Sequence, residues 1–375
     1  MDITVPFLDL RAPYAELKPG IDAAWERVTR SGWYVLGPEV EAFEEEFAAY
    51  CGGAHCVSVS SGAAALELIL RGLGIGPGDE VIVPGHTFAA TWFAVSAAGA
   101  RPVAAEPDPV TGTLDPARVA AAVTARTRAV LPVHLYGYPA DLRAIKEVAA
   151  RHGLAVVEDA AQAPGAVLDG RRVGAGDSTV AFSFYPGKNL GAMGDGGAVV
   201  TSDAALAHRI RLLRNHGSLV KYRHEVVGAN ARLDELQAAI LRVKLPVLDE
   251  WNARRSAVAE RYLRELGGGR FPDLGLPPAA CSRARPVWHL FVVRSARREE
   301  LRLHLAGRGV EALIHYPVAV HRSPAYAGGP AAARALPVSE RLADEVLSLP
   351  IGPHMPDGAV GTVIAAVEEF FTRPR

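Results

Sequence analysis

Two residues of this chain, Lys188 and Asp159, have the types and the setting that covalent chemistry on a carbonyl compound requires. Lys188 follows an apolar segment, residues 180–184, and a Pro-Gly pair, which predicts a tight loop between buried segments. Burial lowers the pKa of a lysine, and the neutral amine condenses with a carbonyl to form a Schiff base. Asp159 ends the apolar run 154–157, where a parallel strand would deliver a carboxylate into a ligand crevice.

Pyridoxal phosphate requires this pair of groups. A lysine holds the cofactor as a Schiff base, and a carboxylate keeps its ring nitrogen protonated, so that the ring can act as an electron sink. Taken singly, each residue has an ordinary interpretation, because a loop lysine is usually solvated and an acidic pair after a strand usually caps a helix. The two residues together make the cofactor hypothesis much more specific.

The elements that must position this pair alternate between strand and helix from residue 55 onward. Such alternation predicts an α/β fold with a seven-stranded, mostly parallel sheet and helices on both faces. The predicted strands cover residues 55–59, 80–83, 102–105, 128–133, 154–157, 180–184 and 197–201, and the helices between the first five cover 63–72, 89–98, 116–125 and 141–151. The last two strands are joined by the Lys188 loop without a helix, so an antiparallel strand is expected there.

Helical patterns also flank this sheet. Two precede it, over residues 14–29 and 38–50, and others follow over 204–215 and 234–245, where Pro246 breaks the last one. A further helix to residue 266, a Gly/Pro-rich loop over 267–286 and a strand over 287–293 indicate a smaller C-terminal α/β domain. We therefore predict a large domain over residues 1–245 and a small domain over 246–375.

Composition excludes several classes of protein. With 375 residues, 49% hydrophobic and 22% charged, the chain is typical of a globular protein and not of a disordered or fibrous one. The formal net charge of −1 gives no overall field for nucleic acid, and no stretch is apolar enough to span a bilayer or serve as a leader, so a cytoplasmic protein without a membrane partner is expected. The three cysteines, Cys51, Cys56 and Cys281, lack the partners of a zinc site, so no metal is expected.

Two further places could contact a cofactor. The first strand runs into its helix through Ser61, Gly62 and Ala63, and free amides at a helix N-terminus bind phosphate, although a serine there is also an ordinary cap. Phe88 follows the second strand and could either stack on an aromatic ring or pack in the core.

The motifs around these residues resemble the DegT/DnrJ/EryC1/StrS aminotransferases. E-D-A-A-Q at 158–162 and F-S-F-Y-P-G-K-N at 182–189 occur in the order of that family, and similar segments run from F-L-D-L at 7–10 to L-S-L-P-I-G-P at 347–353. The resemblance implies the type I fold of pyridoxal-phosphate enzymes and action on nucleotide-linked keto sugars. Pyridoxamine phosphate is then the second form of the cofactor.

The family's site residues carry over position by position. The resemblance implies that Phe88 stacks on the cofactor, that Gln162 lies near its hydroxyl, and that Ser183 and the Gly62 turn hold its phosphate. Residues other than alanine are common at the position of Ala63, so backbone contacts must suffice there. Asn230 is implied to reach the cofactor phosphate of the neighbouring subunit, which makes an obligatory homodimer with shared sites, and the sugar nucleotide is assigned to Tyr185, Lys221, Tyr222, His315 and Tyr316.

The expected reaction is transfer of an amino group from L-glutamate to a keto carbon of a dTDP-linked deoxyhexose, in deoxyaminosugar biosynthesis for a secondary metabolite such as an antibiotic. Glutamine remains open as the donor. The segments F-S-F-Y-P-G-K-N-L-G and K-Y-R-H favour amination at C3, while Ala64, where C3 enzymes commonly carry an aspartate nearby, leaves C4 open. Lys188 argues against a related sugar dehydratase, which replaces this lysine with histidine. A cofactor-binding regulator without turnover is the alternative from another class.

Overall fold

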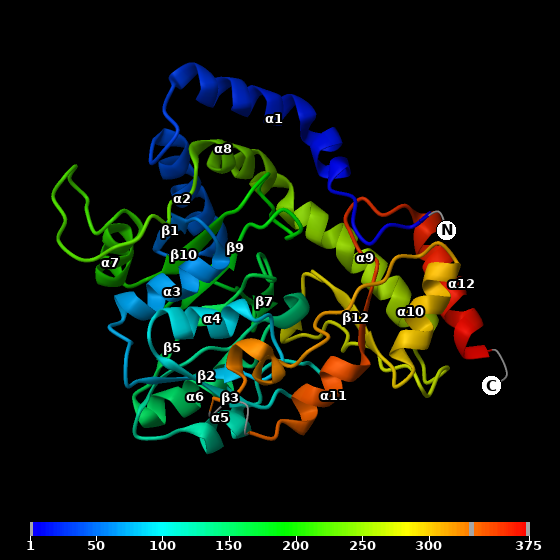
Figure 1. The fold of residues 1–375 in the computed structure, drawn as a ribbon. Helices are drawn as coiled ribbons and strands as arrows, with labels where there is room; N and C mark the ends of the chain where they lie inside the picture. Colours follow the sequence, from blue (N-terminus) through cyan, green and yellow to red (C-terminus); the bar gives the residue numbers. More distant parts are fainter. Residues whose placement is uncertain (1–2, 330–333, 373–375) are drawn as a thin grey trace.

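The computed structural model describes residues 3–329 and 334–372. Its centre is a twisted sheet, with helices packed around it (Figure 1). The strands of this sheet are β1 (His55–Val59), β2 (Glu80–Pro84), β3 (Arg101–Ala105), β4 (Thr127–Val130), β5 (Ala155–Val156), β6 (Glu158–Asp159), β9 (Thr179–Ser183) and β10 (Gly197–Thr201).

Hydrogen bonds make these strands one continuous sheet. β5 pairs with β4 and β6 pairs with β9, and the two short strands are separated only by Val157, whose amide donates to Val130 O at 3.0 Å. The order is therefore β3-β2-β4-β5/β6-β9-β10-β1, with β10 antiparallel to both of its neighbours. This confirms the predicted seven-stranded, mostly parallel sheet, with its antiparallel strand next to the Lys188 loop.

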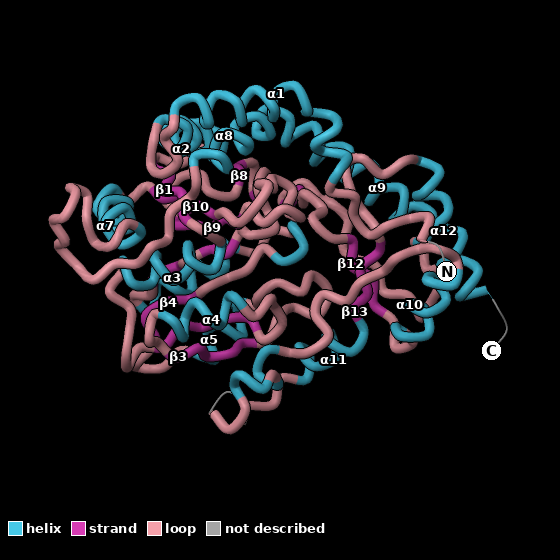
Figure 2. The backbone as a smooth tube through the Cα atoms, turned by 45° about the horizontal axis from the view of Figure 1, so that its top comes forward, coloured by secondary structure: helices cyan, strands magenta, loops and turns pink. Residues whose placement is uncertain are grey.

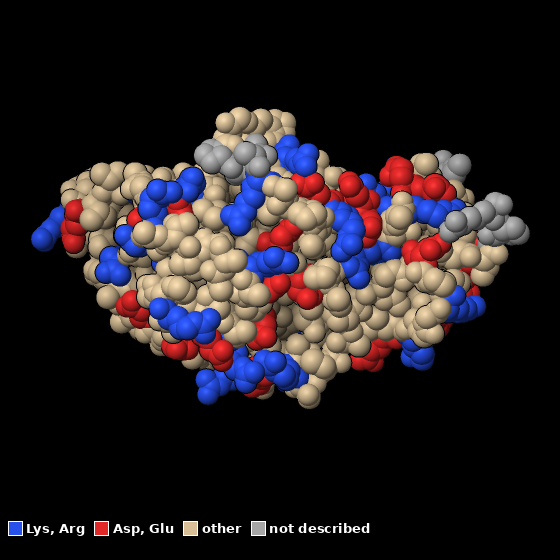
Figure 3. All heavy atoms as spheres, turned by 90° about the horizontal axis from the view of Figure 1, so that it is seen from below, with Lys and Arg blue, Asp and Glu red and all other residues tan. Residues whose placement is uncertain are grey.

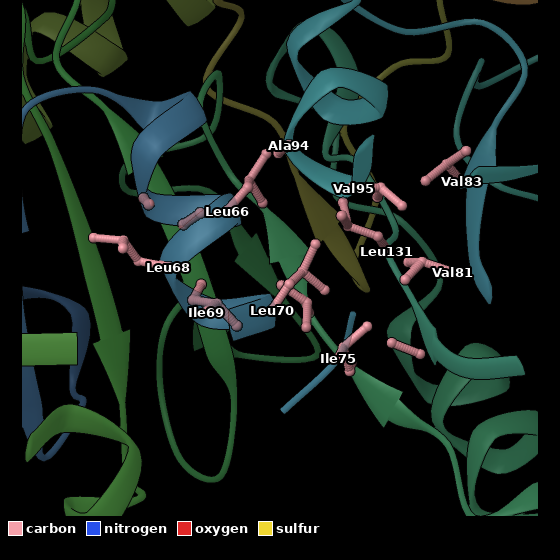
Figure 4. Close-up of a cluster of buried hydrophobic side chains, with 14 of the residues drawn as sticks. Leu66, Leu68, Ile69, Leu70, Ile75, Val81, Val83, Ala94, Val95 and Leu131 are labelled. Carbon is pink, nitrogen blue, oxygen red and sulfur yellow. The ribbon is translucent and has the colours of Figure 1, made fainter. Parts of the chain in front are cut away.

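Alternating side chains bury both faces of the sheet, as expected for parallel strands covered by crossover helices. On one face Val81 and Val83 pack in a cluster with residues of α3 (Gly62–Gly72), α4 (Ala90–Ala97) and α7 (Ala204–Arg214), and Figure 4 shows this packing around Leu66 and Leu70. On the other face Ile82 packs with α5 (Pro116–Ala122) and α6 (Leu142–His152). Farther along that second face, Phe182 packs with α2 (Pro38–Cys51) and α8 (Glu235–Lys244).

A separate hydrophobic cluster holds the C-terminal part together, around Tyr262, Phe291 and Val363. Its elements are α9 (Leu248–Leu266), β12 (Phe291–Arg294), α10 (Arg298–Gly307), β13 (Val346–Leu349) and α12 (Asp357–Thr372), with β12 antiparallel to β13. The helix α11 (Pro337–Glu345) packs through Leu342 in a smaller cluster with Leu290 and Val292. The remaining short elements are β7 (Val167–Leu168), β8 (Arg171–Arg172), β11 (Ala284–Arg285) and the 3₁₀ turns Leu135–Gly137, Leu245–Val247, Val320–Arg322 and Pro324–Tyr326.

The strand predicted over 287–293 begins later than expected, at Phe291. Trp288 has a φ of 49°, in the left-handed region that a strand does not adopt. The amides of Val287 and Leu290 donate to the carbonyls of Gly137 and Tyr136, at 3.1 and 3.3 Å. Residues 287–290 are therefore tied to the loop after β4 and not to a sheet.

The N-terminal residues contact the C-terminal part of the chain. Thr4 and Val5 donate their amides to Gly309 O at 3.0 Å, and Val5 belongs to the hydrophobic cluster of Tyr262. α1 (Arg11–Ser31) then crosses the molecule and packs on α8 (Figure 2). The division into domains at residues 245 and 246 stays a prediction.

The described surface carries both signs of charge. Lys and Arg side chains lie interspersed with Asp and Glu on the face shown in Figure 3, so this face offers no patch of a single sign. No helix in the described ranges is long and apolar enough to cross a membrane. Cys51 and Cys56 are buried, Cys281 is exposed, and all three thiols are free.

Candidate active site

A cavity of about 700 Å³ opens at the carboxyl ends of β6 and β9, between the sheet and the C-terminal part of the chain. Ligands of open α/β sheets bind in this position. The structure brings most of the predicted site residues to its wall: Ser61, Gly62, Ala63, Phe88, Asp159, Gln162, Ser183, Tyr185, Lys188, His315 and Tyr316.

Lys188 lies in the tight loop that the sequence predicts. Its amide donates to Tyr185 O at 2.8 Å, and the amide of Ala192 donates back to Phe184 O at 2.8 Å, which closes the loop on the end of β9. Burial lowers the pKa of Lys188 to about 8, although the negative charge of Asp159 acts in the opposite direction. A substantial fraction of this amine is therefore neutral near physiological pH and able to attack a carbonyl.

Asp159 is buried at the floor of the cavity, with a specific set of partners. Its Oδ2 accepts from Thr91 Oγ1 at 2.9 Å, and its Oδ1 accepts from the amide of Ala161 at 3.1 Å. Burial raises the pKa of Asp159 above its ordinary value. The two hydrogen bonds and the charge of Lys188 offset only part of that rise. A carboxylate held in this way is a strong acceptor for a protonated ring nitrogen.

The turn between β1 and α3 is shaped to hold an anion. Ser61 Oγ caps the helix by accepting from Ala64 N at 3.1 Å, and the first helical amides, those of Gly62 and Ala63, have no helical acceptor. A Cβ on Gly62 would lie 2.7 Å from Ser183 Cβ, so only glycine lets the turn approach β9 this closely. The approach places the Ser183 hydroxyl beside the free amides, where the helix dipole favours a phosphate.

Aromatic and polar groups form a further part of the cavity wall. The rings of Phe88 and Tyr316 lie 5.4 Å apart at 39°, and Phe88 is 56% exposed, so one of its faces is open to a planar ligand. Gln162 Nε2 donates to Tyr316 Oη at 3.0 Å, while its Oε1 accepts from Tyr136 N. Burial lowers the pKa of His315 to about 4, so this imidazole is neutral, and its Nδ1 lies 2.7 Å from Ser348 Oγ.

Three predicted site residues lie outside the cavity of this single chain. Asn230 is exposed and bridges to Asn215, Tyr222 is 84% exposed, and Lys221 Nζ lies 5.1 Å above the Tyr222 ring. All three belong to the segment between α7 and α8, which projects from the body of the molecule in Figures 1 and 2. None of the three lines the cavity, so their role in a site stays a prediction.

Four residues in or near the cavity were not predicted from the sequence: Thr91, Tyr136, Arg255 and His289. Thr91 holds Asp159 and Tyr136 holds Gln162, and nothing in the local pattern distinguishes either from a core residue. Arg255 did leave a signal, because it recurs with Trp251, Val258 and Tyr262 at the buried spacing of α9. A charged residue at a core position of a predicted helix could therefore have identified Arg255 from the sequence.

The sheet order, the loop that carries Lys188 and the carboxylate at the end of the neighbouring strand define the type I fold of pyridoxal-phosphate enzymes. The chain belongs to the DegT/DnrJ/EryC1/StrS aminotransferase family, whose sequence profile matches residues 16–368.

Relatives match the chain over nearly its whole length. It is 61% identical to the dTDP-3-amino-3,4,6-trideoxy-alpha-D-glucose transaminase of Streptomyces venezuelae, over 98% of this chain and 97% of that protein. It is 62% identical to the erythromycin biosynthesis sensory transduction protein EryC1 of Saccharopolyspora erythraea, over 97% and 99% of the two chains. The crystal structure of S. venezuelae DesV in complex with a ketimine intermediate superimposes with a TM-score of 0.96, at 60% identity and 99% coverage of both chains.

Proposed function

We propose that this protein is a pyridoxal-phosphate-dependent aminotransferase that moves an amino group from L-glutamate onto C3 of a dTDP-linked keto-deoxyhexose, in deoxyaminosugar biosynthesis. The observation that carries the proposal is the partly buried amine of Lys188, with its lowered pKa, which lines the same cavity as Asp159, a cavity large enough for a cofactor and a sugar. Position C3 rests on relatives whose names specify a 3-amino sugar, at 61% and 47% identity.

The residues of the cavity fit this cofactor. The turn of Gly62 and Ser183 would hold its phosphate, Phe88 would stack on its ring, and Asp159 would accept a hydrogen bond from its protonated ring nitrogen. When bound, pyridoxal phosphate supplies an aldehyde that accepts amino groups and a ring that withdraws electrons. A similar structure holds such a cofactor, because NtdA of Bacillus subtilis was solved with bound PMP. That structure superimposes with a TM-score of 0.92 at 30% identity, over 100% of this chain and 86% of that one.

Lys188 carries two successive roles in this scheme. Its neutral amine would hold the cofactor through the aldehyde and would be free again once a donor amine is bound. The released Nζ is then free to take a proton from the α-carbon of the donor and to return it one step later. The same Nζ serves the keto sugar in the reverse direction, which predicts ping-pong kinetics.

The lowered pKa predicts how cofactor capture depends on pH. Only the neutral amine of Lys188 attacks the aldehyde, so the capture rate of the cofactor-free protein should rise as pH increases and level off above about 8. At two pH units below that value, about 1% of the amine is neutral. Stopped-flow absorbance with added pyridoxal phosphate measures this profile. A rate that still rises steeply beyond pH 9 would show that Lys188 is solvated.

The projecting segment supports a homodimer with shared sites. Leu219, Val220, Tyr222 and Val227 are large apolar side chains that are 47–87% exposed. Apolar groups gathered on one exposed segment indicate an interaction surface. A second copy of the chain would bury them and would bring Asn230 toward the cofactor phosphate of its neighbour.

Mixed dimers test the shared site. One chain carries Lys188→Ala and the other carries Asn230→Asp, which sets a carboxylate against the cofactor phosphate and should leave either homodimer nearly inactive. If Asn230 acts across the interface, each mixed dimer has one intact site. Random pairing gives about half mixed dimers, so about a quarter of wild-type activity should return on co-expression. Activity no greater than that of the two single variants, in dimers whose mixing is verified by differential tags, contradicts the shared site.

The substrate is tested with the protein in its pyridoxamine phosphate form. Keto sugar nucleotides with the carbonyl at C3 or at C4 are added, and the return of pyridoxal phosphate absorbance is followed. We expect fast return with a dTDP-3-keto-deoxyhexose and a 3-amino product by NMR. A 4-amino product assigns C4 instead. No return with any keto sugar favours a regulator, a role suggested by the name of EryC1, a sensory transduction protein.

A further inference from the structure

We infer that Arg255 is the binding site for a carboxylate of the amino donor, an inference that rests on the proposed function. Arg255 projects from α9, is 3% exposed, and lines the same cavity as Lys188 and Asp159. It belongs to the C-terminal part of the chain, whereas the turn of Gly62 and Ser183 belongs to the sheet.

The charge of Arg255 is not compensated within the chain. Its Nη1 donates to the carbonyls of Trp288, His289 and Ile351, at 3.3 to 3.4 Å, and its buried Nε has no hydrogen-bond partner. Across residues 3–329 and 334–372, no carboxylate forms an ion pair with it. Arg214 shows the contrast, because that buried arginine is paired with Glu44.

An uncompensated buried guanidinium is costly. Moving a charge out of water without a counterion costs several kcal/mol, and protein carbonyls at long distance recover only part of that cost. Burial lowers the pKa of Arg255 to about 10, so the group nevertheless stays charged at neutral pH. A retained cation of this kind, facing a cavity, indicates an anionic ligand.

The chemistry of the donor fits this position. In an α-amino acid the carboxylate is attached to the carbon that bears the amine, so it must be bound close to Lys188, where the amine is exchanged. Lys188, Arg255 and His289 line the same cavity. Burial lowers the pKa of His289, and the positive charges of Lys188 and Arg255 lower it further, so both cations lie near this residue. A guanidinium binds a carboxylate through two parallel hydrogen bonds, and this pairing selects carboxylic acids over neutral amines.

The pyrophosphate of the sugar nucleotide is the alternative anionic ligand for Arg255. The Arg255 side chain lies on the buried face of α9 and against three backbone carbonyls, and this enclosed position favours the carboxylate, the smaller ligand. The two sources make opposite predictions, because the donor and the sugar nucleotide react in separate half-reactions.

The test uses the cofactor-loaded protein and the variants Arg255→Lys and Arg255→Met. The conversion by L-glutamate and the reverse conversion by the keto sugar nucleotide are followed separately by absorbance. We expect the apparent Kd for L-glutamate to rise about 10- to 100-fold in Arg255→Met, the range for loss of a charge-assisted pair. Arg255→Lys should recover part of this loss, and the keto sugar half-reaction should change less than about three-fold in both variants.

The neighbouring arginine provides a matched control. Arg254 lies one position along the same helix but pairs with Glu16 and Glu250 at the surface. Arg254→Met should leave both half-reactions unchanged. Lys and Met retain most of the length of the arginine side chain, so the variants should fold. Thermal unfolding of all variants checks this and separates a binding defect from a folding defect.

Binding of glutarate, the dicarboxylate that lacks the amino group of L-glutamate, tests the inference independently of turnover. Calorimetry should detect glutarate binding to the wild-type holoenzyme and a weakening of at least about ten-fold in Arg255→Met. If wild type binds glutarate but does not transaminate, the proposed function fails while the carboxylate site stands. Equal glutarate affinity in wild type and Arg255→Met, no binding to wild type, or a loss confined to pyrophosphate and the keto sugar would overturn the inference.

Discussion

Lys188→Ala should lose transamination by at least about 10⁴-fold while the protein still folds, because the variant removes both the amine that holds the cofactor and the base that moves the donor proton. The side chain faces the cavity from a loop, so its removal leaves little unpacked volume in the core. Turnover with L-glutamate and a keto sugar nucleotide, together with the absorption spectrum of the bound cofactor, measures the effect. The spectrum should be that of a free aldehyde.

Lys188→Arg is the conservative control. It keeps the positive charge and most of the length, but a guanidinium stays protonated and forms no Schiff base. The arginine variant should therefore be as inactive as the alanine variant. Activity within ten-fold of wild type in either variant would show that another residue performs the exchange.

Asp159→Asn should slow the donor half-reaction by about 10²- to 10³-fold, the usual effect of removing one preorganised electrostatic partner. The amide is nearly the same shape as the carboxylate, so cofactor binding should persist. It cannot balance the charge of a protonated ring nitrogen, and the ring then withdraws electrons less effectively. Single-turnover absorbance with L-glutamate measures the rate.

Thr91→Val separates the charge of Asp159 from its positioning. The valine removes the hydrogen bond to Asp159 Oδ2 but leaves the carboxylate in place. We expect the donor half-reaction to slow less in Thr91→Val than in Asp159→Asn. The folding stability of Asp159→Asn should stay nearly unchanged, because the substitution removes a buried charge. An unaltered single-turnover rate in Asp159→Asn would mean that a different group keeps the ring protonated.

Local patterns in the sequence carried much of the fold. The apolar strands β2 and β9 and the turn residues around Gly187 are short-range signals, and they predicted both the sheet and the loop of Lys188. The motif resemblance supplied the family, which the comparisons confirm.

Long-range contacts were harder to predict. The left-handed backbone at Trp288 follows from hydrogen bonds to residues about 150 positions away, which no local window contains. The partners of Asp159 and Gln162, Thr91 and Tyr136, come from other elements for the same reason. Asn230 is exposed and lies outside the cavity of the single chain, so its role in the site stays a prediction.

The most direct test of the central claim asks which lysine holds the cofactor. Among the residues that the structure describes, two lysines have a pKa that burial lowers to about 8, Lys188 and Lys244. Lys244 donates to Gly191 O and lies outside the cavity. Borohydride reduction of the holoenzyme fixes the cofactor to its lysine, and peptide mass spectrometry then locates it. We predict the added mass on the peptide containing Lys188, and its disappearance when L-glutamate is added before reduction. Added mass on Lys244, or labelling of Lys188 that L-glutamate does not prevent, would contradict the account.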